Sequence, residues 1–455
     1  MPTPSADQLR EWDRTHVWHA FTQMAGYEPL LIERGRGCTL IDMDGREYLD
    51  GVSSLWCNVH GHGHPRLNAA ITEQLAKIAH TTALGASNST TVRLARRLAE
   101  MAPAGLDRVF FSGDGSSAIE VALKMAFQYW RQCDPPQPQK DRYVALASAY
   151  HGDTLGSVSV GGVARFHEMF SPLLFDVLRV PAPDMYRLPD GVSAEEALDY
   201  YLQRADDVLR RQHERIAALV MEPLVQGAAG IMVHPPGYLR GIRELTRKYN
   251  VLLIADEVAV GFGRTGSMFA CQQEDVSPDF LCLAKGLTGG YLPMAATLAT
   301  GRVWQAFLGD AAAHRQFFHG HTYAGNPLAA AVALSSLDVF AEERTLEQMG
   351  PKAVRLAEHL QRISRLPNVG DTRSRGLMGG VELVRDKQTK EPFAADAQRG
   401  ANICRRARGH GVLLRPLGDV IVVMPPLSVT IDELDRIMVA IEESIIAEFR
   451  TGDER

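Results

Sequence analysis

The chain lacks the features that mark membrane, nucleic-acid-binding and disulfide-stabilised proteins. No apolar run approaches the roughly 18 residues that a membrane span needs, and the first residues, "MPTPSADQLREWDRTHVW", hold no apolar signal core. No block of Lys and Arg occurs and the formal net charge is −6, so neither a nucleic acid nor a membrane surface is expected as a partner. The six cysteines form no CxxC pair. That usage is typical of reduced thiols, and we expect a cytoplasmic protein.

Two kinds of site are also disfavoured. The GxxxxGK[ST] motif of nucleotide P-loops is absent, and no GxGxxG follows a strand into a helix. His60, His62 and His64 stand two apart in "VHGHGHP" and invite a metal interpretation. They have no fourth ligand nearby and are separated by glycines, so we expect no metal site.

The length and pattern indicate a multidomain α/β protein. A chain of 455 residues is too long for one simple core. From about residue 65 to 326, short apolar runs such as "IAALVM" and "VLLIAD" alternate with helical segments, which predicts a mainly parallel sheet. We expect an N-terminal segment of a small domain over 1–64, a large α/β domain over 65–335, and the rest of the small α+β domain over 336–455. Asp44-Gly45 marks a hairpin in the first segment.

One lysine stands out in the stretch "SPDFLCLAKGLTGG". Lys285 follows an apolar run typical of a buried strand, and no carboxylate lies beside it in the sequence. A buried ammonium is costly unless it is neutralised or paired. Because ligands bind at the carboxyl ends of parallel strands, Lys285 is a candidate functional residue.

Three further stretches carry polar groups at strand ends. "SGDGSSAIEVALKMA" opens a helix near Ser116 with glycines, which suits a phosphate, although a tight turn with a serine cap is equally consistent. Asp256 ends the strand "VLLIAD"; it either pairs with a cation or makes a structural bridge. Arg264 could bind a carboxylate or lie solvated on the surface, and Tyr150 in "YHGDT" could stack on a ring or fill the core.

The combination favours pyridoxal phosphate. A lysine amine, a carboxylate, an aromatic ring and a phosphate-binding helix start at the strand ends of one sheet match the needs of that cofactor. Lys285 would form the Schiff base, Asp256 would keep the ring nitrogen protonated, and Tyr150 would cover the ring.

The segments "LIADEVAVGFGRTG", "CLAKGLTGG", "YHGDT" and "HGHTYAGNPLAAAVAL" resemble the class III (subgroup II) aminotransferases of fold type I, over nearly the whole chain. "VWHAFTQM", "MEPLVQGAAG" and "LRPLGDVIVVMPPL" are similar to the diaminopelargonate synthases of biotin synthesis. The resemblance implies a homodimer with shared active sites. It also implies transamination of 8-amino-7-oxononanoate to 7,8-diaminononanoate, by exchange between a small amino donor and a keto acid acceptor.

The resemblance further implies roles for individual residues. Lys285, Asp256 and Tyr150 would be catalytic. Thr322 would reach the phosphate of the partner subunit's cofactor, and Gln226 and Asp153 would orient neighbouring groups. The other cofactor-binding residues would be Gly115, Ser116, Glu222 and Val258, and the substrate-binding residues would be Trp56, Arg264, Gly320 and Arg415.

The amino donor and the breadth of activity stay open. Enzymes that resemble the adenosylmethionine-using type carry a tyrosine where this chain has Phe21, a tryptophan where it has Leu55 and a tyrosine where it has Val422. Losing the hydroxyl at Phe21 and the rings at the other two positions removes contacts to a sulfonium and an adenine, which favours lysine as the donor. A general ω-amine transaminase is the alternative within the same fold. A non-catalytic cofactor-binding protein is a remote one, because such a protein need not retain Lys285.

Overall fold

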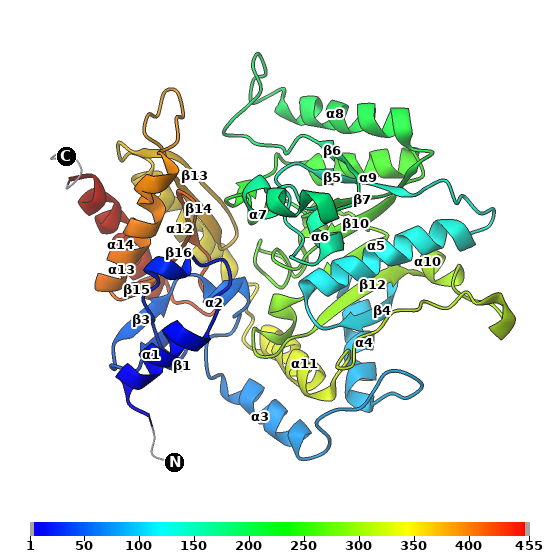
Figure 1. Ribbon diagram of the computed structural model, residues 1–455, viewed down its shortest axis with the longest axis horizontal. Coiled ribbons are helices and arrows are strands. Elements are labelled where there is room, and N and C mark those ends of the chain that lie inside the picture. Colours follow the sequence, from blue (N-terminus) through cyan, green and yellow to red (C-terminus); the bar gives the residue numbers. More distant parts are fainter. Residues whose placement is uncertain (1–3, 451–455) are drawn as a thin grey trace.

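The computed structural model describes residues 4–450 and shows a large sheet-centred region beside a smaller one (Figure 1). The large sheet has seven strands in the order β4-β12-β11-β10-β7-β5-β6. All but β12 run parallel to one another; β12 is antiparallel to both its neighbours. Their bounds are β4 (Leu106–Ser112), β5 (Arg142–Leu146), β6 (Val177–Val180), β7 (Ile216–Met221), β10 (Leu252–Asp256), β11 (Phe280–Leu283) and β12 (Ala295–Thr300). The predicted mainly parallel α/β fold is confirmed.

The central strands are apolar on both faces because helices cover both. Phe280 and Cys282 of β11 pack into a core that contains apolar residues of α5, whereas Leu281 and Leu283 join the core on the other face. This alternation follows from the two-residue period of a strand. The helices of this region are α3 (Pro65–Leu75), α4 (Ser89–Met101), α5 (Gly115–Gln132), α6 (Leu155–Val160), α7 (Ala164–His167), α8 (Ala197–Gln212), α9 (Tyr238–Lys248), α10 (Gly301–Gln305) and α11 (Pro327–Glu342).

The smaller region combines both ends of the described chain. The predicted hairpin forms β2 and β3, and the C-terminal strand β15 pairs in parallel with β3, so blue and orange segments lie together in Figure 1. A second, antiparallel sheet has the order β13-β14-β17-β16. The strands are β1 (Ile32–Arg36), β2 (Thr39–Asp42), β3 (Glu47–Asp50), β13 (Val369–Arg375), β14 (Met378–Leu383), β15 (Val412–Leu413), β16 (Arg415–Leu417) and β17 (Val420–Val423). Its helices are α1 (Ala6–His16), α2 (Ser53–Trp56), α12 (Met349–Ile363), α13 (Arg399–Gly409) and α14 (Ile431–Arg450).

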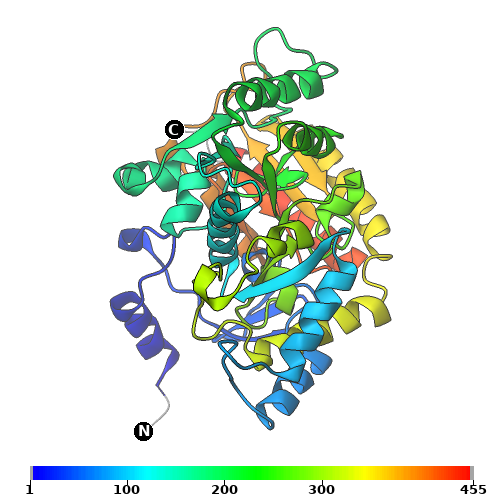
Figure 2. The same ribbon diagram turned by 90° about the vertical axis from the view of Figure 1, so that its right-hand side faces the viewer.

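Two details bear on the domain prediction. Helix α11 runs through the expected boundary at 335/336 and packs against α3 and α4 of the large region. Helix α1 lies at the edge of the molecule and buries none of its residues (Figure 2).

The predicted domain boundaries stay predictions. The predicted domains also include residues 1–3 and 451–455, which lie outside the described residues. Within 4–450, no helix is both long and apolar enough to cross a bilayer.

Candidate active site

A cavity of about 400 Å³ opens at the carboxyl ends of the central strands. Strands β10 and β11 pair in parallel, so the residues that end or follow them reach the same edge of the sheet. Eight of the residues singled out in the sequence line this cavity: Trp56, Gly115, Ser116, Tyr150, Glu222, Asp256, Val258 and Lys285. The fold thus gathers groups that are scattered along the chain.

Lys285 lies directly beyond β11, where it begins the short 3-10 helix η4 (Lys285–Thr288) with a positive φ of 44°. Its Nζ lies 5.2 Å from the centre of the Trp56 ring. Burial lowers the pKa of Lys285, although the negative charges of Asp256 and Glu222 oppose that shift. A lowered pKa favours the uncharged amine, which is the nucleophilic form that can attack a carbonyl group.

Asp256 is held by two hydrogen bonds. It is 4% exposed; its Oδ2 lies 2.7 Å from His151 Nδ1, and its Oδ1 accepts from the Val258 amide at 3.0 Å. The other ring nitrogen of His151, Nε2, is buried without a partner among the described residues. The two bonds fix the orientation of the carboxylate at the cavity wall.

His151 was not singled out from the sequence, although it is 3% exposed and lines the cavity. The available signal was its place in "YHGDT", directly after Tyr150 at a strand end. A histidine in a short polar turn has many possible partners. Only the folded chain brings it to Asp256, 105 positions further along.

Tyr150 and Glu222, which also line the cavity, are joined by a hydrogen bond. The Tyr150 amide donates to Glu222 Oε1 at 3.2 Å, and the phenol donates to Asp153 Oδ2 at 2.6 Å. Burial and the bond to Asp153 raise the pKa of Tyr150, which keeps the phenol protonated. Burial also raises the pKa of Glu222 to about 7, with His151 lowering it and Asp256 raising it. Glu222 is therefore poised to exchange a proton near neutral pH.

The start of α5 offers an anion site. Asp114 caps the helix by accepting from the Ser117 amide at 2.8 Å, while no partner of the Gly115 and Ser116 amides is found within 4–450. A Cβ added to Gly115 would lie 2.7 Å from Val258 Cγ1, so only glycine lets the backbone come this close. Free amides at a helix N-terminus favour a phosphate.

These residues fit pyridoxal phosphate. The Lys285 amine, for which no ion pair or hydrogen bond is found within 4–450, would bond to its aldehyde, and the Gly115 and Ser116 amides would hold its phosphate. Asp256 would pair with the ring nitrogen, with Val258 and Tyr150 against the ring. The roles themselves stay predictions.

Other predicted site residues do not line the cavity. Arg264 is 2% exposed and donates to the carbonyls of Pro425 at 2.5 Å and Asn58 at 2.7 Å, so binding a substrate there would require a bond to break. Gly320 and Thr322 lie on the exposed loop before α11. A residue must be exposed to reach a partner's site, and Thr322 meets that condition. Its role stays a prediction.

Arg415 and Gln226 also lie outside the cavity lining. Arg415 is half-buried in β16, close enough to Tyr150 for an electrostatic interaction, and its guanidinium lies 5.8 Å from the Phe21 ring. No ion pair of Arg415 is found within the described residues. Gln226 is fully buried and donates to the Ala147 carbonyl at 2.9 Å.

The three histidines of "VHGHGHP" are engaged separately. His60, His62 and His64 bond to a serine, an aspartate and a glutamate respectively, at 2.9–3.0 Å. In the part of the chain that the structure describes, no group of three or more His, Cys, Asp and Glu residues is placed to hold a metal ion.

Comparisons with known proteins agree on the family. The sequence profile described as "Aminotransferase class-III" matches residues 22–445. The chain is 53% identical over 443 residues to the adenosylmethionine-8-amino-7-oxononanoate aminotransferase of Nitratidesulfovibrio vulgaris, covering 97% of this chain and 82% of that protein.

Two solved structures are similar. The crystal structure of the enzyme of that same name from Methanocaldococcus jannaschii has a TM-score of 0.92 at 39% identity, covering 97% of this chain and 99% of that one. An amine transaminase from an uncultivated Pseudomonas species, in its PLP-bound form, has a TM-score of 0.91 at 37% identity, covering 95% and 99%. This chain therefore belongs to the class-III aminotransferases, which are pyridoxal-phosphate-dependent transaminases.

Proposed function

We propose that this transaminase converts 8-amino-7-oxononanoate to 7,8-diaminononanoate in biotin synthesis. The observation that carries the proposal is the 53% identity, over nearly the whole chain, to a relative named for that substrate. The cavity also suits an aliphatic keto acid, because Ala228, Leu292, Pro293 and Met294 add apolar surface to its lining. Arg415, which lies near Tyr150, would bind the substrate carboxylate.

The chain's own residues divide the work between binding and proton transfer. Bound pyridoxal phosphate supplies an aldehyde that exchanges amino groups and a ring that withdraws electrons. Lys285, with its lowered pKa, is the group that takes and returns the substrate proton at its Nζ. Asp256, oriented by His151 and the Val258 amide, supplies a fixed negative charge at the cavity wall.

Two amino donors are each supported by one observation. The relative's name points to adenosylmethionine. Lysine is favoured by Phe21, which lacks a tyrosine hydroxyl, and by Leu55 and Val422, which lack an aromatic ring suited to an adenine or a sulfonium. Of these, Leu55 is 48% exposed and Val422 is buried at 1% in β17. Neither lines the cavity, so the preference for lysine rests on the residue types at these positions and not on an observed contact.

A general ω-amine transaminase is the second candidate, supported by the likeness to the Pseudomonas amine transaminase. We further propose a homodimer in which each site is completed by Thr322 of the other subunit. The exposed position of Thr322, away from its own chain's cavity, supports this arrangement.

The test is a half-reaction followed by a full one. The cofactor-loaded enzyme is mixed with lysine or with adenosylmethionine, and loss of the absorbance of the bound cofactor is recorded. The enzyme recovered from the productive mixture is then given 8-amino-7-oxononanoate, and the diamine is measured by mass spectrometry. Conversion by adenosylmethionine alone would overturn lysine as donor. Turnover of simple amines with no diamine formed would overturn the biotin-pathway substrate and support the second candidate.

A further inference from the structure

The segment between β7 and the short strand β9 (Met232–Val233) forms a wall shared by two cavities. Ala228 lines the active-site cavity, whereas its neighbour Ala229 lines a second cavity of about 470 Å³. The second cavity lies between the large region and strands β13, β14 and β17 of the small region. A shift of this wall would therefore change the shape of the active site.

The backbone of this wall is strained. Leu224 has a φ of 65° and Ile231 a φ of 58°, both in the left-handed region. For a β-branched residue such as isoleucine this conformation is a genuine outlier, and it persists only where the surroundings hold it.

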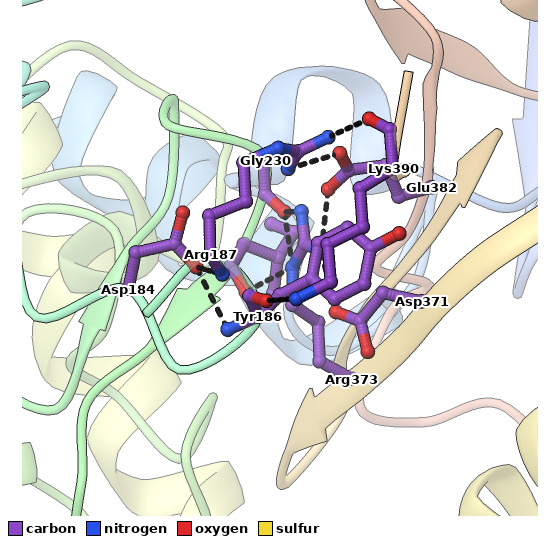
Figure 3. A network of polar contacts seen from close by, with 9 residues as sticks. Asp184, Tyr186, Arg187, Gly230, Asp371, Arg373, Glu382 and Lys390 are labelled. Atoms are coloured by element: carbon purple, nitrogen blue, oxygen red, sulfur yellow. Dashed lines mark hydrogen bonds and ion pairs between the residues drawn. The ribbon is translucent and has the colours of Figure 1, made fainter. Parts of the chain in front are cut away.

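Arg373, on β13 of the small region, clamps the strained end of the wall (Figure 3). Its Nε and Nη2 donate to the Gly230 carbonyl at 2.9 and 2.6 Å, and Nε also donates to the Ile231 carbonyl at 3.2 Å. Its Nη1 is anchored on Asp371 at 2.6 Å and Glu382 at 2.7 Å. Both ends of the guanidinium are thus used, which a lysine ammonium cannot reproduce.

A short series of hydrogen bonds connects the clamp with the catalytic cavity. The Ile231 amide donates to the Gly227 carbonyl at 2.9 Å. The Gly227 amide in turn donates to Glu222 Oε2 at 2.8 Å, and Glu222 Oε1 accepts from the Tyr150 amide. Each bond fixes the next group in the series, which runs from Arg373 to Glu222 and the Tyr150 amide in the cavity that also contains Lys285.

We propose that Arg373 is a positioning residue for transamination: by clamping Gly230 and Ile231 it holds Glu222 in place and ties the small region to the active-site wall. The inference rests on membership of the aminotransferase family and not on the identity of the substrate. It assigns a role in the reaction to a residue outside the cavity.

The experiment compares Arg373→Lys with Arg187→Ala. Arg187 pairs with the same Glu382, at 2.5 Å, but no hydrogen bond from it to Gly230 or Ile231 is found within 4–450, so it controls for damage to the ion-pair network. Hydrogen–deuterium exchange of the peptide covering 222–234 is measured for each purified protein. The rate of the donor half-reaction is measured with a donor that converts the unaltered enzyme.

We expect Arg373→Lys to speed exchange in 222–234 by about tenfold or more, with little change in the strands β13 and β14. The half-reaction should slow by roughly 10- to 100-fold, because small displacements of catalytic groups have effects of that size. Arg187→Ala should stay within about twofold of the unaltered enzyme in both measurements.

Equal exchange in 222–234 for Arg373→Lys and the unaltered protein would overturn the proposal. So would faster exchange spread evenly over the small region, since that result assigns Arg373 a purely structural role. If Arg373→Lys is not recovered folded, Arg373→Gln takes its place with the same criteria, because a glutamine amide cannot span both carbonyls. Failure of the biotin-pathway substrate would leave the exchange result unaffected.

Discussion

Replacing Asp256 by asparagine removes the negative charge from the cavity wall with little change in shape. The asparagine oxygen can still accept from the Val258 amide, as Asp256 Oδ1 does at 3.0 Å. The substitution removes the charged partner for the cofactor's ring nitrogen. It also replaces the carboxylate oxygen that lies 2.7 Å from His151 Nδ1 by an amide group. Binding of the phosphate at the start of α5 is separate from this change and should persist.

The size of the effect follows from the burial of the site. Asp256 is 4% exposed, so water does not replace the missing charge. A hydrogen bond to a charged group contributes roughly 1.5–3 kcal/mol, and each 1.4 kcal/mol changes a rate tenfold. We therefore expect Asp256→Asn to slow the donor half-reaction by roughly 10- to 140-fold.

The assay is a single-turnover measurement by stopped-flow absorbance. Glu257→Gln is the matched control, because this adjacent carboxylate is equally buried but bonds to the Ala270 and Cys271 amides and does not line the cavity. The control should react at close to the rate of the unaltered enzyme. A half-reaction of Asp256→Asn within twofold of the unaltered rate would refute the role given to this carboxylate.

Three further predictions concern the cofactor, pH and assembly. Gly115→Ala should weaken cofactor binding about tenfold in absorbance titrations, because the added Cβ would lie 2.7 Å from Val258. Gly113→Ala is the control, since its Cβ would have no atom closer than 4.0 Å, and it should bind the cofactor as the unaltered enzyme does. Equal affinities of the two variants would contradict the prediction. Burial raises the pKa of Glu257 from 4.5 to about 7, so its contribution to stability is lost as the pH rises from about 4.5 to about 7. The unfolding free energy of the unaltered protein minus that of Glu257→Gln should fall over that range, and a constant difference would refute the shift. Thr322→Val should lower cofactor affinity by roughly 2- to 10-fold in a dimer, and sedimentation showing a fully active monomer would exclude shared sites.

The sequence predicted the elements whose patterns are local. The buried runs of β7, β10 and β11 and the helical period of α5 were identified, with α5 beginning at Gly115 beside the expected Ser116. Strand β13 was missed, because its sequence "VGDTRSR" is polar and only Val369 is buried.

The candidate site was predictable as far as it depends on strand ends. Lys285 and Asp256 could be located because a charged residue after an apolar run is unusual. The partner of Asp256, His151, and the clamp at Arg373 depend on contacts between residues more than a hundred positions apart. No local pattern encodes such a pairing. For the same reason the sequence did not indicate that Arg264 is enclosed by backbone carbonyls.

We predict that Lys285 carries the cofactor. Borohydride reduction of the cofactor-loaded enzyme, followed by digestion and mass spectrometry, fixes the cofactor to the lysine that holds it. We predict the label on the peptide containing Lys285, and no label on that peptide in Lys285→Ala. A label on another lysine, such as the buried Lys140, or none in an active enzyme, would show that Lys285 does not carry the cofactor.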